Sequence, residues 1–354
     1  MNINKMKKSN KDIVTESTPL MPRDSAKLIS RLAKDVFIEE EGVKNISCEI
    51  LEGLKNRKIS IENFFNHELL PKEDDPRALD WIFILDVLNF CFWNKKDDTR
   101  WKVNGESGYF ALCAAIKRSL EEGIPILDAS FCSKITKSVL ENILRGDSGS
   151  TAVPLIDERV QNLQEVGRVL LEKYNGTFQE CVRRCSDSAE KLLKLIVQDF
   201  QCFRDEAVFK GHKVSFYKRA QILVADVWAC FKGKGFGKFY DIDSLTMFAD
   251  YRVPQVLVHF GAMRYSNSLL SKLQSESELK PGCDEEIEIR GCSIETVERV
   301  VKEVRSLIVQ YPLLELKESD CGAVQIDFFL WYYRRQHKEE LDKVPYHKVR
   351  TIYY

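Results

Sequence analysis

An aspartate among aromatic and apolar residues is the first candidate for chemistry in this sequence. Asp250 stands within residues 247–257, MFADYRVPQVL, where two aromatic rings, a guanidinium and a thioether are its neighbours. The apolar residues that follow recur at helical spacing, and Pro254 suits a first helical turn, which has no use for its missing N–H. A carboxylate in this setting is costly to bury unless it is paired or employed. Asp250 therefore either caps a helix or acts on a ligand, and the residues alone leave both readings open.

A second acid lies in an almost wholly apolar stretch. Asp327 stands within residues 324–331, VQIDFFLW, which we expect to be helical. A lone carboxylate there needs a partner, and the ordinary explanation is a buried salt bridge or a hydrogen bond to another helix. Trp331 follows four residues later. The sequence therefore predicts one helix face that carries both an acid and a large ring.

Residues 81–93, WIFILDVLNFCFW, form a dense run of aromatic and branched side chains. The run is short and turn-forming residues follow it, so we expect a buried strand or hairpin arm, with residues 101–103 as its partner. Strand alternation would place Asp86 on one face and Asn89 on the other. We interpret these two residues and Trp93 as support for a pocket rather than as groups that do chemistry.

The segment KGKGFGK, residues 232–238, has the glycines of a phosphate-binding loop. It lacks the Ser or Thr that follows the lysine of such loops and does not follow a clear strand, so we interpret it as a flexible surface loop. The serines, cysteines and remaining histidines form no recognisable nucleophile–base arrangement in the sequence.

The composition limits the classes of partner. Of the 354 residues 44% are hydrophobic, which supports a packed core, and the formal net charge is −1. Duplex nucleic-acid binders usually carry a basic excess, so a large polyanionic substrate is disfavoured while a single phosphate is not. The eleven cysteines include no paired C-x-x-C set. We therefore expect no metal site, and free thiols in a reducing compartment.

No apolar run reaches the length of a transmembrane helix, and the lysine-rich segment from Met1 to Lys11 has no signal-peptide core. A cytosolic or nuclear protein that does not bind membranes fits these features best.

The elements that position the candidate residues are predicted to be mostly helices. We expect a disordered leader at residues 1–20 and a single domain over residues 21–354. Within it, a mixed α/β part covers about 21–135 and a helical part about 136–354. The fold class is thus mainly α, within the α+β class, with a small sheet nearer the N-terminus.

Periodicity and capping signals place several helices within this domain. A polar loop is expected at residues 272–286. The predicted helices cover residues 22–39, 107–120, 293–310 and 321–341.

Several ordered blocks together resemble the queuosine salvage proteins, which are hydrolases that release the modified base queuine from queuosine 5′-phosphate. The blocks are MFADYRVPQVL (247–257), SFYKRAQ (215–221), EIRGC (288–292), FILDVLNFCFW (83–93), PYH (345–347) and IYY (352–354). The resemblance runs from about Ala26 to Tyr354. Its specificity comes from the agreement of several blocks, since no single one would suffice.

The resemblance implies roles for individual residues. Asp250 matches an aspartate that lies at the reacting ribose, where it would stabilise an oxocarbenium-like charge or activate water. Asp327 and Trp331 match residues that face the bound base. Met247 and Phe248 would form a wall on which the flat base stacks, a contact of about 1–3 kcal/mol.

One further position matches the family and one departs from it. His67, in FFNHEL, matches a ligand contact that could donate to a sugar or base oxygen. Ala323 is too small to supply a polar base contact if the family uses one at that position.

The residue that would hold the 5′-phosphate is left open. Lys218, Arg252 and Arg290 are the candidates, because an arginine grips a phosphate with two hydrogen bonds and a lysine offers a point charge. Lys218 ranks first, since the SFYKRAQ match is unbroken. The ordinary alternative for Arg290 is an ion pair with Glu288.

The resemblance implies an N-glycosidase that hydrolyses queuosine 5′-phosphate to queuine and ribose 5-phosphate, with no metal or organic cofactor. Queuine so released would be salvaged for tRNA modification. Part of the fold is expected to look like the helix-hairpin-helix DNA glycosylases. The alternatives are a DNA-repair-type glycosylase, which would need a basic groove for flipped-out DNA, and a non-catalytic tRNA-binding protein in which Asp250 is only a cap.

Overall fold

The computed structural model describes residues 18–94 and 100–354, and helices dominate them, as the sequence predicts. The helices of seven or more residues are α1 (Pro22–Leu32), α2 (Glu40–Lys55), α3 (Ala78–Val87), α4 (Tyr109–Glu121), α6 (Lys137–Ile143), α7 (Ile156–Lys173), α8 (Phe178–Arg184), α9 (Ala189–Asp199), α10 (Lys218–Cys230), α11 (Val253–His259), α12 (Asn267–Gln274), α13 (Asp284–Gln310) and α14 (Ala323–Gln336). Helices α5 (Ala129–Cys132) and α15 (Lys338–Leu341) have four residues each.

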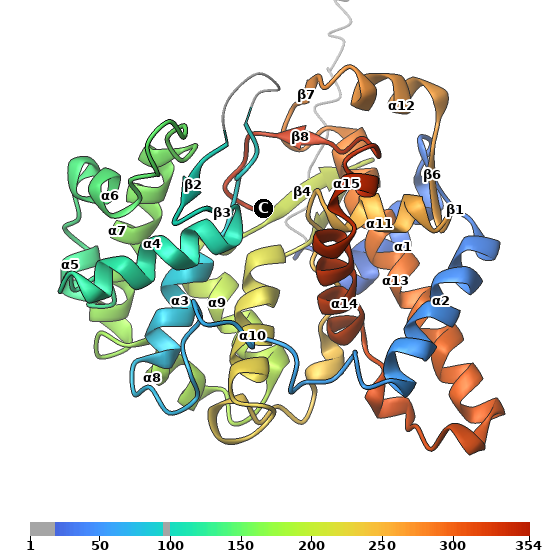
Figure 1. Cartoon of the computed structure of the whole chain (residues 1–354), viewed down its shortest axis with the longest axis horizontal. Helices are drawn as coiled ribbons and strands as arrows, with labels where there is room; N and C mark the ends of the chain where they lie inside the picture. Colours follow the sequence, from blue (N-terminus) through green and yellow to red (C-terminus); the bar gives the residue numbers. More distant parts are fainter. Residues whose placement is uncertain (1–17, 95–99) are drawn as a thin grey trace, which may run out of the picture.

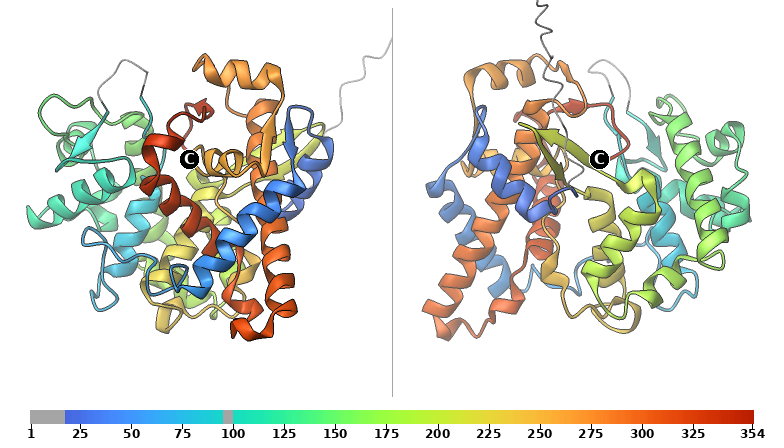
Figure 2. Two further views of the ribbon diagram at one scale, coloured as in Figure 1. Left: turned by 45° about the vertical axis from the view of Figure 1, so that its right-hand side comes forward. Right: turned by 180° about the vertical axis from the view of Figure 1, so that it is seen from behind.

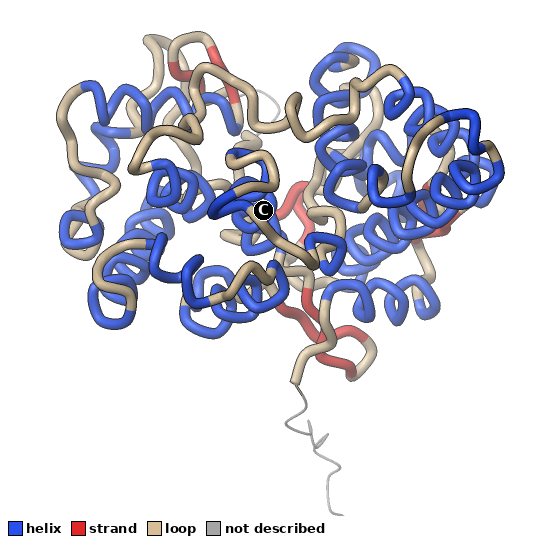
Figure 3. Tube along the Cα trace, turned by 90° about the horizontal axis from the view of Figure 1, so that it is seen from below, coloured by secondary structure: helices blue, strands red, loops and turns tan. Residues whose placement is uncertain are grey.

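The strands form two-stranded ladders instead of one small sheet near the N-terminus (Figure 3). Three ladders are antiparallel and one is parallel. The antiparallel ladders pair β1 (Val36–Ile38) with β6 (Met263–Tyr265), β2 (Lys102–Val103) with β3 (Glu106–Ser107), and β4 (Glu206–Phe209) with β5 (His212–Ser215), and the parallel ladder pairs β7 (Glu278–Leu279) with β8 (Lys348–Val349). Two of the four ladders join segments that lie far apart in the sequence.

The helices lie in two groups with α10 and α14 between them (Figure 1). Helices α3 to α9 form one group, and α1, α2, α11 and α13 form the other; the rear view shows the same division (Figure 2). Contacts support this arrangement, because α13 packs against α1, α2, α11 and α14, while α10 packs against α3 and α9. Helices α10 and α14 are therefore placed to carry side chains of a site between the two groups.

The expected strand at residues 81–93 is wrong, because its first half is the helix α3. Every residue of α3 except Asp80 is buried, so apolar side chains occur on all sides and no helical period is visible in the sequence. Residues 102–103 pair with β3 instead of with this run. Asp86 and Asn89 consequently do not lie on opposite strand faces; the Asn89 amide donates to the Asp86 carboxylate at 3.2 Å.

Several predicted boundaries shift for identifiable reasons. The first helix ends at Leu32 because residues 36–38 pair with β6, far away in sequence. Helix α13 begins at Asp284 rather than at 293, because the acidic residues that suggested a polar loop favour a helix N-terminus. The expected helix 321–341 is divided into α14 and α15 at His337.

Three further expectations concern the ends and the surface of the fold. Residues 1–17 of the predicted leader lie outside the described residues, and Leu20 already pairs with Val214. The segment 232–238 contains a short 3₁₀ turn, and none of its residues lines the cavity described below. Over residues 18–94 and 100–354, every helix is too short or too polar to cross a bilayer.

Candidate active site

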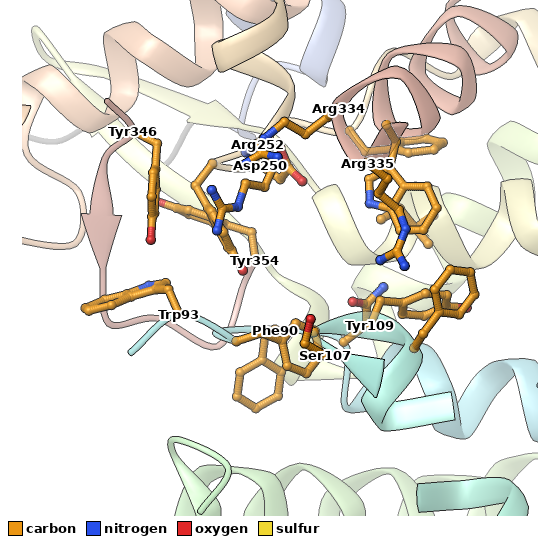
Figure 4. Close-up of a pocket in the computed structure, with 18 of the residues that line it drawn as sticks. Phe90, Trp93, Ser107, Tyr109, Asp250, Arg252, Arg334, Arg335, Tyr346 and Tyr354 are labelled. Atoms are coloured by element: carbon orange, nitrogen blue, oxygen red, sulfur yellow. Dashed lines mark hydrogen bonds between the residues drawn. The ribbon is translucent and has the colours of Figure 1, made fainter. Parts of the chain in front are cut away.

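A cavity of about 540 Å³ opens between the two groups of helices. Its walls come from α10, α14, the start of α4, the segment after α3 and the C-terminal segment around β8. Aromatic side chains form much of the lining, and nearly as many charged side chains lie among them. In Figure 4, Tyr346 and Trp93 lie at one end, Asp250 and Arg252 lie in the middle, and Tyr109 and Arg335 lie at the other end.

Asp250 lies in this cavity wall, in the turn that precedes α11. Its Oδ1 atom accepts the backbone N–H groups of Arg252 and Val253, both at 2.8 Å. Arg252 is the N-cap residue of α11, so Asp250 is not the N-cap itself, but one of its oxygens satisfies two N–H groups at the start of the helix. The other oxygen has no hydrogen-bond partner among the described residues, so Asp250 can both start the helix and present a carboxylate oxygen to a ligand.

Lys218, the first residue of α10, is buried and also lines the cavity. Its ammonium has no hydrogen bond or ion pair with any residue in the described ranges. Burial lowers the pKa of Lys218, while the nearby charges of Asp250, Asp86 and Asp327 oppose that shift. The Lys218 ammonium thus lies close enough to Asp250 to be affected by its charge, without a hydrogen bond or ion pair between them.

Asp327 and Trp331 both line the cavity from α14, so the predicted shared helix face is confirmed. Asp327 accepts the backbone N–H of Phe248 at 2.9 Å, and no cation lies within 4 Å of it among the described residues. Burial raises its pKa well above the ordinary value. The salt-bridge interpretation is therefore wrong, and the hydrogen bond joins Asp327 to the segment before α11 instead of to another helix. Phe248 lines the cavity, whereas Met247 is fully buried outside the lining.

The pocket-support residues differ in how they meet the cavity. Asn89 and Trp93 line it, and the Trp93 indole N–H donates to Val349 O at 3.1 Å, which ties this wall to β8. Asp86 is buried behind Asn89 and outside the lining. Burial raises its pKa, and the Asn89 amide and the Lys218 charge oppose that shift.

Arg290 serves the structure around the site and does not line it. Its two Nη atoms bind both oxygens of Asp205, and its Nε atom donates to Ala249 O at 3.0 Å. Asp205 also accepts the backbone N–H of Lys218 at 3.1 Å. This buried pair therefore connects the residue before Asp250 with the start of α10. The expected ion pair with Glu288 is wrong, because that carboxylate accepts two backbone N–H groups near the end of α1.

Arg252 contributes to a group of cations at the Tyr346 end of the cavity. Its guanidinium lies 4.2 Å from the centre of the Tyr346 ring, and Lys348 Nζ lies 5.7 Å from the same centre. Arg334 is close by. Burial is the main cause that lowers the pKa of Arg334, and the positive charges of Arg252 and Arg100 lower it further. Two carboxylates of the lining partly balance these charges, because Asp342 pairs with Arg334 and lies 4.0 Å from Arg252, while Glu276 pairs with Lys348 at 3.2 Å. The three cations still exceed the two carboxylates, as is expected where an anion binds.

His67 lies behind the cavity wall instead of in it. Its ring stacks on the Phe110 ring with centroids 4.0 Å apart, and Phe110 lines the cavity. One ring nitrogen accepts the backbone N–H of Leu69 at 3.2 Å. In this structure His67 supports an aromatic wall, and a direct ligand contact would require its ring to move.

Sequence reasoning missed several lining residues, among them Asp226, Tyr109 and Lys348. Asp226 lies eight residues after Lys218 on α10, so both project from one helix face, with Ile222 between them. That spacing was a usable signal, but it is informative only once residues 218–230 are assigned to a single helix. Among the described residues, no group of three His, Cys, Asp or Glu side chains is arranged to hold a metal ion.

The sequence is similar to those of known proteins over most of its length. Residues 69–354 match the model of the family described as queuosine salvage protein. Relatives named queuosine 5′-phosphate N-glycosylase/hydrolase include the Bos taurus protein, 44% identical over 95% of this chain and 99% of its own. A second is the Schizosaccharomyces pombe protein, 36% identical over 93% and 98%. The Sphaerobacter thermophilus protein of the same name is 36% identical over 91% of this chain and 94% of its own. The chain belongs to the queuosine salvage protein family.

Proposed function

We propose that this protein is an N-glycosidase that hydrolyses queuosine 5′-phosphate to queuine and ribose 5-phosphate, for salvage of queuine into tRNA modification. The observation that carries the proposal is the Asp250 carboxylate, which is fixed by two backbone N–H groups and keeps one oxygen toward an aromatic cavity. The relatives act, by their names, on this nucleotide.

The order of charges along the cavity supports one orientation of the nucleotide. Arg252 at the Tyr346 end suits the 5′-phosphate, and Lys348 would join it by exchanging its ion pair with Glu276 for the phosphate. Asp250 in the middle (Figure 4) is then at the ribose. Phe248 and Trp331, which line the same cavity, offer ring surfaces to the flat base. Asp327 suits the amidine-like edge of the deazaguanine, which presents N–H donors to a carboxylate.

This orientation separates Lys218 from the phosphate. Asp250 lies close enough to this ammonium to affect its pKa, so a phosphate dianion beside Lys218 would also meet the Asp250 carboxylate. Lys218 is better placed to balance the charge of Asp250 next to the ribose. Arg290 is excluded from phosphate binding in this arrangement because Asp205 and Ala249 occupy its guanidinium.

The reaction breaks the bond between C1′ and the base and adds water at C1′. As the bond lengthens, positive charge develops on the ribose, and a carboxylate at the position of Asp250 stabilises it. Asp250 then accepts a proton from the attacking water. A deazaguanine has carbon in place of N7, so the proton that the leaving base needs must reach another atom, such as O6 or N3.

Base release from three substrates tests this function. Purified protein is incubated with queuosine 5′-phosphate, with queuosine, or with DNA that contains deazaguanine, and free base is measured by chromatography. We expect release to be fastest from the nucleotide. Release from DNA alone would favour a repair-type glycosylase, and no release together with tRNA binding would favour the non-catalytic alternative.

Three further inferences, on the fold, the partners with the location, and the domain, accompany the proposal. The helices around the cavity are the part that we infer to resemble helix-hairpin-helix glycosylases. The net charge of −1 supports a small nucleotide rather than duplex nucleic acid as partner. The free cysteines of the described residues support a cytosolic or nuclear location, where thiols stay reduced. We also infer one domain from residue 21 onward, because α1, α2 and α13 pack together across nearly the whole sequence.

A further inference from the structure

Asp226 is a buried carboxyl group that takes no part in the reaction proposed above. It lies on α10 with 5% of its surface exposed, and it lines the cavity. The Tyr109 hydroxyl approaches its Oδ2 atom only at 3.5 Å, the limit of a hydrogen bond. Its Oδ1 atom has no partner among the described residues, and no cation lies within 4 Å of either oxygen there. A buried acid that faces a cavity without a cation or a good donor is expected to await one from a ligand.

The surroundings of Asp226 suit a cation from the ligand. Tyr109, Phe110 and Trp331 form adjoining rings at this end, with the Tyr109 and Trp331 planes at 85° and their centroids 6.2 Å apart. Ring faces and a carboxylate together are the usual surroundings of a bound ammonium. The Arg335 guanidinium lies over the Phe110 and Trp331 rings, but it pairs with Glu106 and not with Asp226.

The position of Asp226 along α10 matches the far end of the substrate. Lys218 and Asp226 are eight residues apart, which is about 12 Å along a helix axis. With Lys218 beside Asp250 at the ribose, Asp226 lies beyond the base, on the side away from the Tyr346 cations. The part of queuosine that extends beyond the deazaguanine is its aminomethyl-cyclopentenediol arm, whose secondary amine is a cation at neutral pH.

We propose that Asp226 binds the amine of the queuosine arm and so makes the cavity selective for bases that carry an amino group on this substituent. This inference rests on the proposed function, because it uses the orientation of the nucleotide given above. Burial raises the pKa of Asp226 well above its ordinary value, so the empty site avoids an isolated charge until an ammonium is bound.

Binding of three free bases to the wild-type protein and to Asp226→Asn tests the proposal. The bases are queuine, 7-aminomethyl-7-deazaguanine and the neutral 7-methyl-7-deazaguanine, and affinity is measured by calorimetry. We expect the wild type to bind both amine-bearing bases at least about tenfold more tightly than the methyl base. Asp226→Asn should reduce this preference to less than about threefold, since a neutral amide loses the charge pairing. A preference unchanged in the variant, or absent in the wild type, would overturn the assignment.

A matched variant and a second substitution at the site complete the experiment. Asp80→Asn is the matched variant, because Asp80 is a largely buried acid on α3 that binds Thr177 and Phe178 outside the cavity, and it should keep the full preference. An effect of Asp226→Asn on queuine but not on the aminomethyl base would assign Asp226 to the diol and contradict the amine contact. Asp226→Ser replaces Asp226→Asn if the latter does not melt cooperatively. Wild-type protein that binds the bases selectively yet releases no queuine from the nucleotide would refute the proposed function alone.

Discussion

The Arg290–Asp205 pair offers a prediction in which stability and catalysis are linked. Both side chains are buried and joined by two hydrogen bonds, and each also holds a backbone group at the site, Ala249 O or Lys218 N–H. Removing one partner of such a pair leaves an uncompensated charge and costs about 3–5 kcal/mol. Arg290→Leu is therefore expected to destabilise the protein and to displace Asp250 relative to Lys218.

The size of the thermal effect follows from the length of the chain. An unfolding entropy of about 2 cal/mol/K per residue gives about 0.7 kcal/mol/K for 354 residues. A loss of about 3–5 kcal/mol then corresponds to a decrease in Tm of about 4–7 °C. Because both positions that flank the reacting ribose depend on the pair, kcat should fall at least about tenfold, with a smaller change in KM.

Thermal melts and steady-state kinetics measure these effects together. The matched comparison is the double variant Asp205→Leu/Arg290→Leu, which removes both charges and should lose less than the sum of the single losses. If Arg290→Leu lowered the Tm by less than about 1 °C, the structural role of the Arg290–Asp205 pair would be refuted. A rise in KM confined to the phosphorylated substrate would also refute it, because that result would identify Arg290 as a phosphate ligand.

Three further predictions concern the cavity and its support. Arg252→Ala should reduce the preference, measured as kcat/KM, for queuosine 5′-phosphate over queuosine. Lys218→Ala should lower kcat/KM for the nucleotide and the nucleoside alike. The reverse pattern would identify Lys218 as the phosphate ligand. Asp327 has a raised pKa, so its burial destabilises the protein progressively as pH rises above the unfolded value near about 4. Asp327→Asn should therefore melt higher than the wild type at neutral pH, lose that advantage below the unfolded pKa, and bind queuine more weakly; equal melting at neutral pH would contradict the raised pKa. Gly291→Ala should lower stability by about 1–3 kcal/mol in chemical denaturation, because its new Cβ would lie 2.5 Å from Ile29; an unchanged midpoint would show that α1 can shift.

The parts of the site that the sequence predicted are those with a local signal. Asp250 before Pro254 indicated a helix start, and the four-residue spacing of Asp327 and Trp331 placed both on one face of α14. The family blocks added the likeness to a hydrolase, which the comparisons with known proteins confirm. Which oxygen of Asp250 is free depends on backbone geometry that no residue pattern reveals.

The parts that could not be predicted depend on contacts between distant segments. Arg290 pairs with Asp205, 85 positions earlier, rather than with its sequence neighbour Glu288. The run around Asp86 is buried on all sides, which erases the helical period and made it look like a strand. Asp226 was missed because an acid in a helix is ordinary until the cavity beside it is known.

The most direct test of the catalytic role of Asp250 is queuine release by Asp250→Asn under single-turnover conditions, compared with the wild type. The amide keeps the shape of the side chain and can still accept the N–H groups of Arg252 and Val253 with its oxygen, so folding and nucleotide binding should persist. Loss of the negative charge should slow release of queuine from bound queuosine 5′-phosphate by at least about a hundredfold. Release near the wild-type rate by a folded variant that binds the nucleotide would contradict this role.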